Sequence, residues 1–334
     1  MKKYLLPKGM NAYKANLHCH TTISDGDYTP EEIKKHYMDN GYSIVAYTDH
    51  EILLPHQDLA DANFLPLNGY EYEVLSPEKP NNPAHKLRKT CHMCLIALAP
   101  DNLEHVCWPE GLWGNAKKYR HLAKIKDEPV YQQVYGGECI SHVMQTARNN
   151  GFFVTYNHPT WYMEDMADIQ HYHGMHAMEI YNNGCRMSGH FEYNPTVYSD
   201  ILRRGERIYC IAADDTHVQR DLCGGWTMIF AEKLEYRTVT KALVDGHFYA
   251  STGPQIEELF FEDGKIHLKC SPAQKIFAAC GSRTTKKIVR GEQPLTEAVI
   301  PVEQDDIFIR LTIWDEDGNH ADTNAYFTDE LFAE

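Results

Sequence analysis

The chain has 334 residues, of which 43% are hydrophobic and 24% are charged. This composition excludes a disordered or collagen-like chain, and no apolar run approaches the roughly 20 residues that span a bilayer. The formal net charge of −15 argues against a basic surface for phosphate, so we expect no nucleic-acid duplex and no membrane as partner. Ten cysteines are too few for a disulfide scaffold, and the first residues lack a secretory signal, so we expect a cytoplasmic location.

The first 250 residues alternate between short apolar runs and helical patterns. Thr29 is a typical N-cap, Pro30 suits the first helical position, and Glu32 supplies the acid of a capping box. Strands separated by helical patterns predict βαβ units and a parallel sheet closed as a barrel. We predict strands at residues 43–47, 65–70, 91–99, 152–155, 177–181 and 208–213, and helices at 138–149 and 195–204.

Two insertions interrupt this pattern, at about residues 76–90 and 101–137. The first is polar and rich in proline and asparagine, which predicts a loop, and the second contains a basic patch and tryptophans that favour an ordered lid. After about Pro254 the helical patterns stop, and strands are expected at residues 256–261, 265–270, 275–280, 298–302 and 308–314. We therefore predict an α/β barrel domain at 1–254 and a small antiparallel, β-sandwich-like domain at 255–334.

Histidines and carboxylates lie just after the predicted strands. His18 and His20 flank Cys19, so in extended chain their imidazoles point the same way. The ends of parallel barrel strands meet at one rim, where catalytic residues lie. Imidazole and carboxylate ligands suit Zn²⁺, Mn²⁺ or Fe²⁺. The candidate metal-binding side chains at or near these strand ends are His18, His20, Asp25, Asp49, His50, Glu71, Glu73, His92, His158, Asp214, Asp215 and His217, and Glu71 and Glu73 compete because they share the same strand face.

These residues lie in motifs that resemble, in order, those of the PHP (polymerase and histidinol phosphatase) family of metal-dependent phosphoesterases. The resemblance covers residues 16 to about 254, and residues 248–254 with the tail resemble a branch that includes carbamate-hydrolysing members. The motifs are His18-Cys19-His20, Ser24-Asp25-Gly26, Thr48-Asp49-His50, the Gly-x-Glu at residues 69–71, Asn157-His158-Pro159 and Asp215-Thr216-His217.

The resemblance implies a distorted seven-stranded (β/α) barrel, similar to a TIM barrel, that holds two or three divalent metal ions. By the family pattern, Glu71 bridges the first two metals. Many family members have histidine where this chain has Asp25. The implied ligands are His18, His20, Glu71 and Asp215 for the first metal, Glu71, His92 and His158 for the second, and Asp25, His50 and His217 for the third.

A metal cluster of this kind predicts hydrolysis of a small-molecule phosphate mono- or diester by a metal-activated hydroxide. His217 or Asp25, if not fully engaged as ligands, or the freer His190, would donate a proton to the leaving group. Arg186 follows another predicted strand and is a candidate for binding the phosphate, although a surface ion pair explains it equally well. The alternatives are an amide or carbamate hydrolase using the same site, and a non-catalytic metal-binding module. The sequence does not indicate the oligomeric state.

Overall fold

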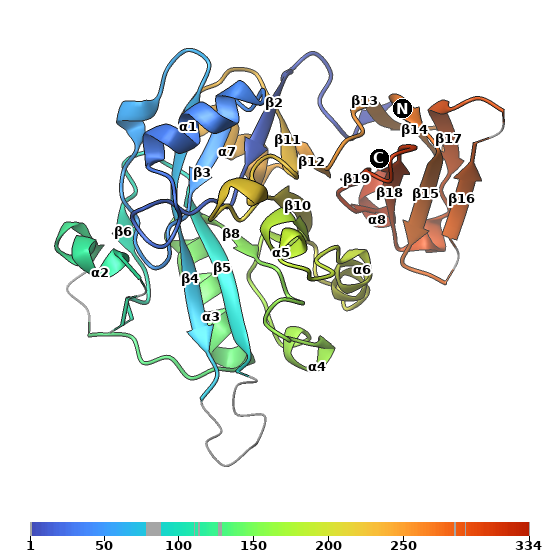
Figure 1. The fold of residues 1–334 in the computed structure, drawn as a ribbon. Coiled ribbons are helices and arrows are strands. Elements are labelled where there is room, and N and C mark those ends of the chain that lie inside the picture. Colours follow the sequence, from blue (N-terminus) through green and yellow to red (C-terminus); the bar gives the residue numbers. More distant parts are fainter. Residues whose placement is uncertain are drawn as a thin grey trace.

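The computed structural model shows a mixed α/β fold in which strands outnumber helices (Figure 1). Helices surround the strands of the N-terminal part, and the C-terminal strands stand beside it, next to both ends of the chain. Among the described residues, no helix is long and apolar enough to cross a membrane. The structure describes residues 2–77, 88–109, 111–112, 114–125, 129–283, 285–290 and 292–333.

The strands and helices that the sequence predicted are present with bounds close to those expected, and further elements lie among them. The helices are α1 (Pro30–Asp39), α2 (Ala116–Tyr119), α3 (Gly137–Asn149), α4 (Met166–Ile169), α5 (Asn183–Met187), α6 (Pro195–Arg203), α7 (Tyr236–Val244) and α8 (Thr328–Leu331). The strands are β1 (Lys3–Tyr4), β2 (Asn11–Asn16), β3 (Ile44–Tyr47), β4 (Leu65–Leu75), β5 (Thr90–Ala97), β6 (Glu104–His105), β7 (Lys124–Ile125), β8 (Phe152–Tyr156), β9 (Ala177–Asn182), β10 (Tyr209–Ala213), β11 (Trp226–Ala231), β12 (Phe248–Ser251), β13 (Ile256–Glu262), β14 (Lys265–Ala273), β15 (Lys275–Cys280), β16 (Thr285–Val289), β17 (Leu295–Pro301), β18 (Phe308–Trp314), β19 (His320–Thr323) and β20 (Tyr326–Phe327).

The capping box predicted for the first helix is present at the start of α1. The Thr29 hydroxyl accepts a hydrogen bond from the Glu32 amide at 3.3 Å, and the Glu32 carboxylate accepts one from the Thr29 amide at 2.8 Å. These two bonds satisfy amide groups that have no partner within the helix. The start of α1 is thus set by local sequence.

The long sheet runs in the order β10-β9-β8-β5-β4-β3-β2-β11-β12 and continues into C-terminal strands. The predicted parallel pairing is confirmed for β2 with β3, β3 with β4, β8 with β9 and β9 with β10. It is wrong for β5, which runs antiparallel to both β4 and β8. Adjacent antiparallel strands need only a loop between them, whereas parallel strands need a crossover, and here the first insertion connects β4 to β5. Residues 78–87 of that insertion lie outside the described residues.

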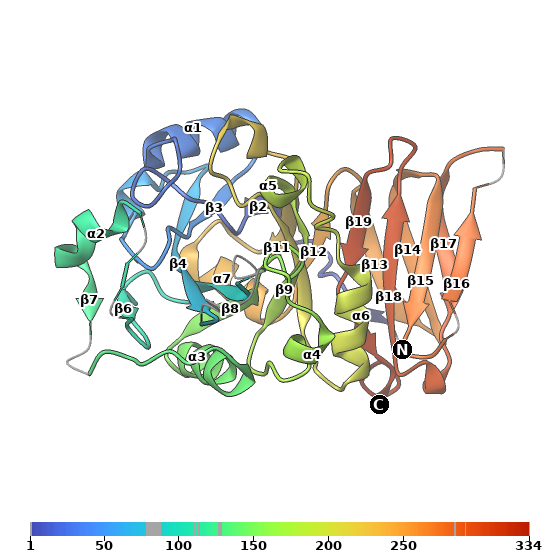
Figure 2. The same ribbon diagram turned by 60° about the horizontal axis from the view of Figure 1, so that its bottom comes forward.

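The run of strands from β10 to β2 curls until its two ends approach each other. Cys19, after β2, forms a bridge with Thr216, after β10. The His20 amide donates to the Thr216 carbonyl and the Asp215 amide to the His18 carbonyl, both at 3.0 Å. Helices α1 and α3 lie on opposite outer sides of these strands (Figure 2). No ladder joins β2 directly to β10 among the described strands, so the closed seven-stranded barrel stays a prediction.

The strands after Pro254 pair only in antiparallel fashion within the described residues. Their apolar side chains, among them Leu259, Ile276 and Leu311, share one buried core. Two pairings tie this part to the rest of the chain: β1 pairs with β13, and β12 pairs with β19. The predicted boundary at residue 254 is therefore crossed by the N-terminal strand, and the division into two domains stays a prediction.

The buried His105 lies in the second insertion and links it to the segment after β3 by hydrogen bonds. His105 is 2% exposed, accepts a hydrogen bond from the Leu53 amide at 2.9 Å, and donates one to the Lys124 carbonyl at 3.1 Å. An imidazole that accepts at Nε2 while it donates from Nδ1 must be neutral. Burial lowers the pKa of His105 to about 4, which favours this neutral form.

The folded protein should lose stability through His105 as the pH falls from about 6.5, the usual histidine pKa in an unfolded chain, towards 4. Between pH 7 and pH 5 this residue should cost about 2 kcal/mol of unfolding free energy. His105→Gln keeps a donor and an acceptor but does not titrate, so its loss should be smaller by that amount. Urea unfolding of both proteins at the two pH values measures the difference, and parallel losses would contradict the assignment.

Candidate metal centre

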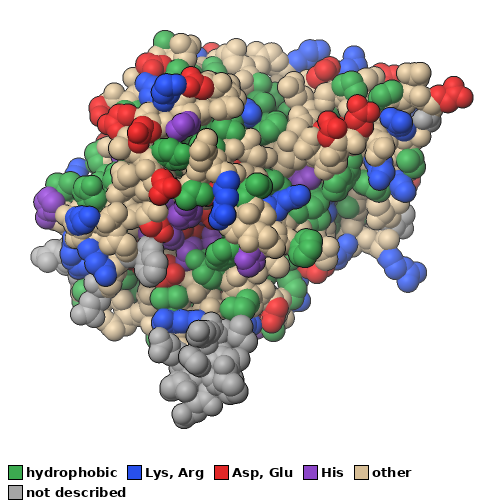
Figure 3. Space-filling view, in the orientation of Figure 1, with side chains coloured by type: hydrophobic (Ala, Val, Ile, Leu, Met, Phe, Trp, Pro, Cys, Tyr) green, Lys and Arg blue, Asp and Glu red, His purple; other side chains and the backbone are tan. Residues whose placement is uncertain are grey.

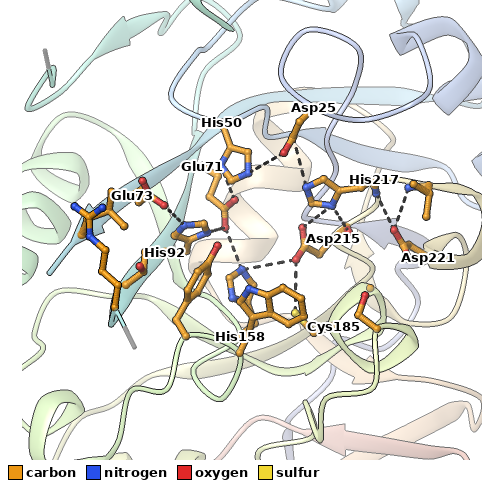
Figure 4. Close-up of a pocket in the computed structure, with 18 of the residues that line it drawn as sticks. Asp25, His50, Glu71, Glu73, His92, His158, Cys185, Asp215, His217 and Asp221 are labelled. Carbon is orange, nitrogen blue, oxygen red and sulfur yellow. Dashed lines mark hydrogen bonds and ion pairs between the residues drawn. The ribbon is translucent and has the colours of Figure 1, made fainter. Parts of the chain in front are cut away.

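The nine predicted metal ligands lie close together at the rim of the curled sheet, and seven of them line one pocket (Figure 4). The other two, His18 and His20, contact the Glu71 and Asp215 carboxylates. The nine ligands come from six strands or the segments that directly follow them. Because β5 is antiparallel to β4, its first residues lie at the same rim as the last residues of β4, and His92 pairs in register with Glu73. The positions are His18, His20 and Asp25 after β2, His50 after β3, Glu71 within β4, His92 within β5, His158 after β8, and Asp215 and His217 after β10.

Glu71 lies at the centre of this cluster and is 1% exposed. Five imidazoles approach its carboxylate, which is more than any other described carboxylate receives. Among the described imidazoles, that of His92 is the one near the Glu73 carboxylate, with its Nε2 3.0 Å away, although Glu73 competed with Glu71 in the sequence analysis. The distances to Glu71 are 3.2 Å from His18 Nε2, 3.3 Å from His20 Nε2, 3.2 Å from His50 Nδ1, 2.9 Å from His92 Nδ1 and 3.2 Å from His158 Nε2.

Asp215 faces Glu71 across the two N-terminal imidazoles. Its Oδ1 lies 3.3 Å from His18 Nε2 and 3.2 Å from His20 Nε2, and these two nitrogens are themselves 3.1 Å apart. Asp215 has φ = 51°, a left-handed conformation that costs energy for a residue with a Cβ. A Cβ on Gly184 would lie 2.7 Å from the Asp215 carbonyl oxygen, so glycine at this position lets α5 pack against the strained segment.

Asp25 lies on the solvent side of the cluster, with a side chain 30% exposed. Its Oδ1 is 3.6 Å from His20 Nδ1 and 3.5 Å from His217 Nε2, and its Oδ2 is 3.6 Å from His50 Nε2. The predicted third group, Asp25 with His50 and His217, is therefore brought together, and His20 joins it.

Four sets of ligand atoms lie within 4.8 Å of one another and could each hold a cation. Their membership overlaps the three predicted sets without reproducing them, and Cys94 was not among the predicted ligands. The sets are His20, Asp25, His50 and His217; His18, His158 and Asp215; His18, Glu71 and Cys94; and His50, Glu71 and His92.

The pKa shifts within the cluster indicate that its carboxylates favour positive charge beside them. Burial opposes protonation of His20, but the adjacent carboxylates of Asp215 and Glu71 outweigh it and raise the pKa of His20 to about 10. Burial likewise works against Glu71 ionisation, yet the charges of His92 and His18 hold its pKa well below the usual range. The buried Asp215 Oδ1 and His92 Nδ1 make no hydrogen bond within the described part of the chain. Nitrogen and oxygen donors whose lone pairs converge without hydrogens between them fit divalent cations.

Glu179 supports the cluster from behind, a role that the sequence analysis did not predict. It lies in β9, is fully buried, and its Oε1 accepts a hydrogen bond from His18 Nδ1 at 2.7 Å. Its Oε2 accepts from the His158 amide at 3.0 Å and from Asn182 Nδ2 at 2.9 Å, and Asn182 also donates to Asp215 at 3.2 Å. The sequence signal that could have indicated this role is a single acid within an otherwise uncharged, buried strand.

A pocket of about 570 Å³ opens over the cluster. Figure 3 shows a hollow with histidine and acidic side chains at its base and Lys or Arg side chains at its edge. Arg88 and Arg220 line this pocket, together with Trp161 and Tyr162. Arg220 donates to the Ser188 hydroxyl at 3.2 Å, and Arg88 donates to the Ser76 carbonyl at 2.6 Å.

Arg186 and His190 lie away from the pocket lining formed by the described residues. Arg186 is exposed, and its guanidinium lies 5.7 Å from the centre of the Tyr181 ring. The His190 ring lies 4.1 Å from the Trp161 ring, centre to centre, so it reaches the pocket only through that tryptophan. Their predicted roles in substrate binding and proton donation stay predictions.

The chain matches no protein-family model and no curated protein. Among solved structures it is similar to a two-domain protein containing a predicted PHP-like metal-dependent phosphoesterase from Bacteroides vulgatus, with 14% identity, 97% of each chain covered and a TM-score of 0.45. A putative metal-dependent phosphoesterase from Bifidobacterium adolescentis has 14% identity and a TM-score of 0.35, covering 64% of this chain and 90% of that one. An amidohydrolase from Chromobacterium violaceum has 15% identity and a TM-score of 0.39, covering 61% and 87%. One of these three structures is described as PHP-like, after the family whose motifs the sequence resembles.

Replacing Glu179 should weaken metal binding without removing any predicted ligand. In Glu179→Gln one carboxylate oxygen becomes an NH₂ group that cannot accept a hydrogen bond, so either the His18 imidazole or the backbone amide of His158 with Asn182 loses its acceptor. We expect affinity for Zn²⁺ or Mn²⁺ to fall about 10- to 100-fold in a chelator competition measurement.

The matched control is Glu164→Gln, a second buried acid, which accepts hydrogen bonds from the hydroxyls of Tyr135, Tyr156 and Tyr172. These hydroxyls can reverse their roles, and none lies on the cluster, so metal affinity should stay at the wild-type value. Equal affinities in wild type and Glu179→Gln would contradict the role assigned to Glu179.

Proposed function

We propose that this chain is a PHP-type metal-dependent hydrolase that cleaves a small-molecule phosphate mono- or diester. The observation that carries the proposal is the convergence of five imidazoles on the buried Glu71 carboxylate at the base of a pocket lined by two arginines. A structural ion-pair cluster would not need an open pocket above it. A phosphate substrate needs both parts, a site for cations and fixed positive charge beside it.

Two or three divalent ions, Zn²⁺, Mn²⁺ or Fe²⁺, are the implied cofactors. We assign them to the nine predicted ligands, with Glu71 shared between ions because its two oxygens face different imidazoles. When bound, such ions lower the pKa of a water molecule towards 7 and neutralise the charge on phosphate oxygens. The seven-stranded barrel of the family is part of this proposal, since it would place all these ligands on one rim.

The remaining steps belong to side chains around the cluster. Arg220 and Arg88 supply guanidinium groups that can orient the phosphate, and hydrogen bonds to Ser188 and Ser76 hold them in place. For the proton of the leaving group we favour whichever of His217 and Asp25 is not fully engaged as a metal ligand, because both line the pocket and are 30% exposed. His190 is a weaker candidate because Trp161 separates it from the pocket.

A second candidate function is hydrolysis of an amide or carbamate at the same site. The apolar side chains of Leu75, Trp161 and Val218 in the pocket lining favour it, because they suit a substrate that carries no charge. The two arginines favour the phosphate ester.

A substrate panel on metal-analysed protein separates the two functions. We expect turnover of phosphomonoesters or phosphodiesters. Chelation should abolish it and Mn²⁺ or Zn²⁺ should restore it, because the metal ions would supply the Lewis acid that activates water. Turnover of carboxylic esters or carbamates without any phosphate ester would transfer the assignment to the second candidate.

Asp215→Asn and His18→Ala should remove bound metal and hydrolysis together. Asn keeps the shape of Asp215 but supplies no charge to the imidazoles of His18 and His20, so loss of metal does not depend on misfolding. Metal content, turnover and circular dichroism measure the effect, and His267→Ala on β14, whose ring stacks on Phe260, is the control histidine variant. Full activity in Asp215→Asn would contradict the proposed mechanism.

A further inference from the structure

Tyr162 covers two of the candidate metal ligands with its ring. Its centroid lies 4.3 Å from that of His92 and 5.3 Å from that of His158, each at an interplanar angle of 46°. The turn that carries it is anchored, because the Trp161 amide donates to the His158 carbonyl at 3.1 Å and the Thr160 hydroxyl donates to Glu192 at 3.0 Å. The ring is therefore held at one place in the pocket wall.

The hydroxyl of Tyr162 differs from those of three other tyrosines, which donate to protein acceptors. Tyr156 donates to Glu164 at 2.7 Å, Tyr135 to the same carboxylate at 3.0 Å, and Tyr72 to the Cys107 carbonyl at 2.6 Å. Within the described residues the Tyr162 hydroxyl makes no hydrogen bond, and the residue lines the pocket. The Tyr326 hydroxyl also lacks a partner within the described residues, but it does not line the pocket. A phenol that is largely buried normally has a partner, so a hydroxyl left facing a pocket is available to a ligand.

The surroundings of this hydroxyl select the kind of ligand atom it meets. The nearby carboxylates of Glu71, Glu73 and Asp215 can only accept hydrogen bonds when ionised. The imidazoles of His18 and His92 face these carboxylates. On this side of the pocket, Tyr162 thus supplies a neutral O–H donor beside ligands assigned to cations. An oxyanion held by those cations would present its other oxygens to such a donor.

We infer that Tyr162 is a catalytic residue whose hydroxyl donates a hydrogen bond to a non-bridging oxygen of the substrate phosphate, while its ring fixes the imidazoles of His92 and His158. The inference rests on the proposed function, because it needs a phosphate over the cluster. It adds a transition-state contact that neither the nine predicted ligands nor the two arginines provide.

Two variants separate the hydroxyl from the ring. Tyr162→Phe keeps the ring, so metal content and melting temperature should match the wild type, while kcat/KM on the best phosphoester should fall about 10- to 100-fold. The affinity of the Mn²⁺-loaded protein for inorganic phosphate, measured by calorimetry, should also weaken about tenfold. Tyr162→Leu removes the ring and should lower metal content as well.

The matched control is Tyr135→Phe, which removes a hydroxyl bound to Glu164 and outside this pocket, and should bind phosphate as the wild type does. Equal phosphate affinity in wild type and Tyr162→Phe, or no phosphate binding by either, would overturn the inference. Absence of phosphoester turnover by the wild-type protein would instead contradict the proposed function. A tenfold loss of phosphate affinity in Tyr162→Phe supports the inference in either case.

Discussion

The burial of the Glu71 carboxylate is the constraint on which the rest of the site depends. An ionised acid that is 1% exposed is tolerated only when positive charge or hydrogen-bond donors surround it. Here five imidazoles from four strands, β2, β3, β5 and β8, or from the segments that follow them, must lie within 3.3 Å of the Glu71 carboxylate. Glu179 extends the constraint outwards, because it fixes the orientation of His18 and the backbone at His158.

The fold meets this constraint by bringing strand ends to one rim from both directions. Strands β2, β3, β8 and β10 are followed by ligands. Strand β5 runs in the opposite direction, and its ligand His92 lies near its beginning. The close approach also has a conformational cost. His158 and Asp215 both adopt positive φ, and such strain is stored where surrounding structure holds it in place.

The pocket would reconcile an acidic protein with the anionic substrate that we propose. A net charge of −15 repels phosphate at long range, so attraction must be local. The carboxylates Glu71 and Asp215 recruit cations rather than oppose the substrate, and Arg88, Arg220 and Tyr162 supply donors around the same space.

The sequence by itself indicated what depends on near neighbours: the capping box at Thr29, the approximate bounds of eleven strands and of α3 and α6, and a set of candidate ligands at strand ends. The sequence could not determine the direction of β5 or the placement of β1 beside β13, because strand pairing depends on contacts between distant segments. For the same reason only the tertiary structure distinguished Arg220, which lines the pocket, from Arg186, which does not, and revealed Glu179 and Tyr162. Strand ends can be recognised from local patterns, but which side chains share a cavity is decided when the sheet curls.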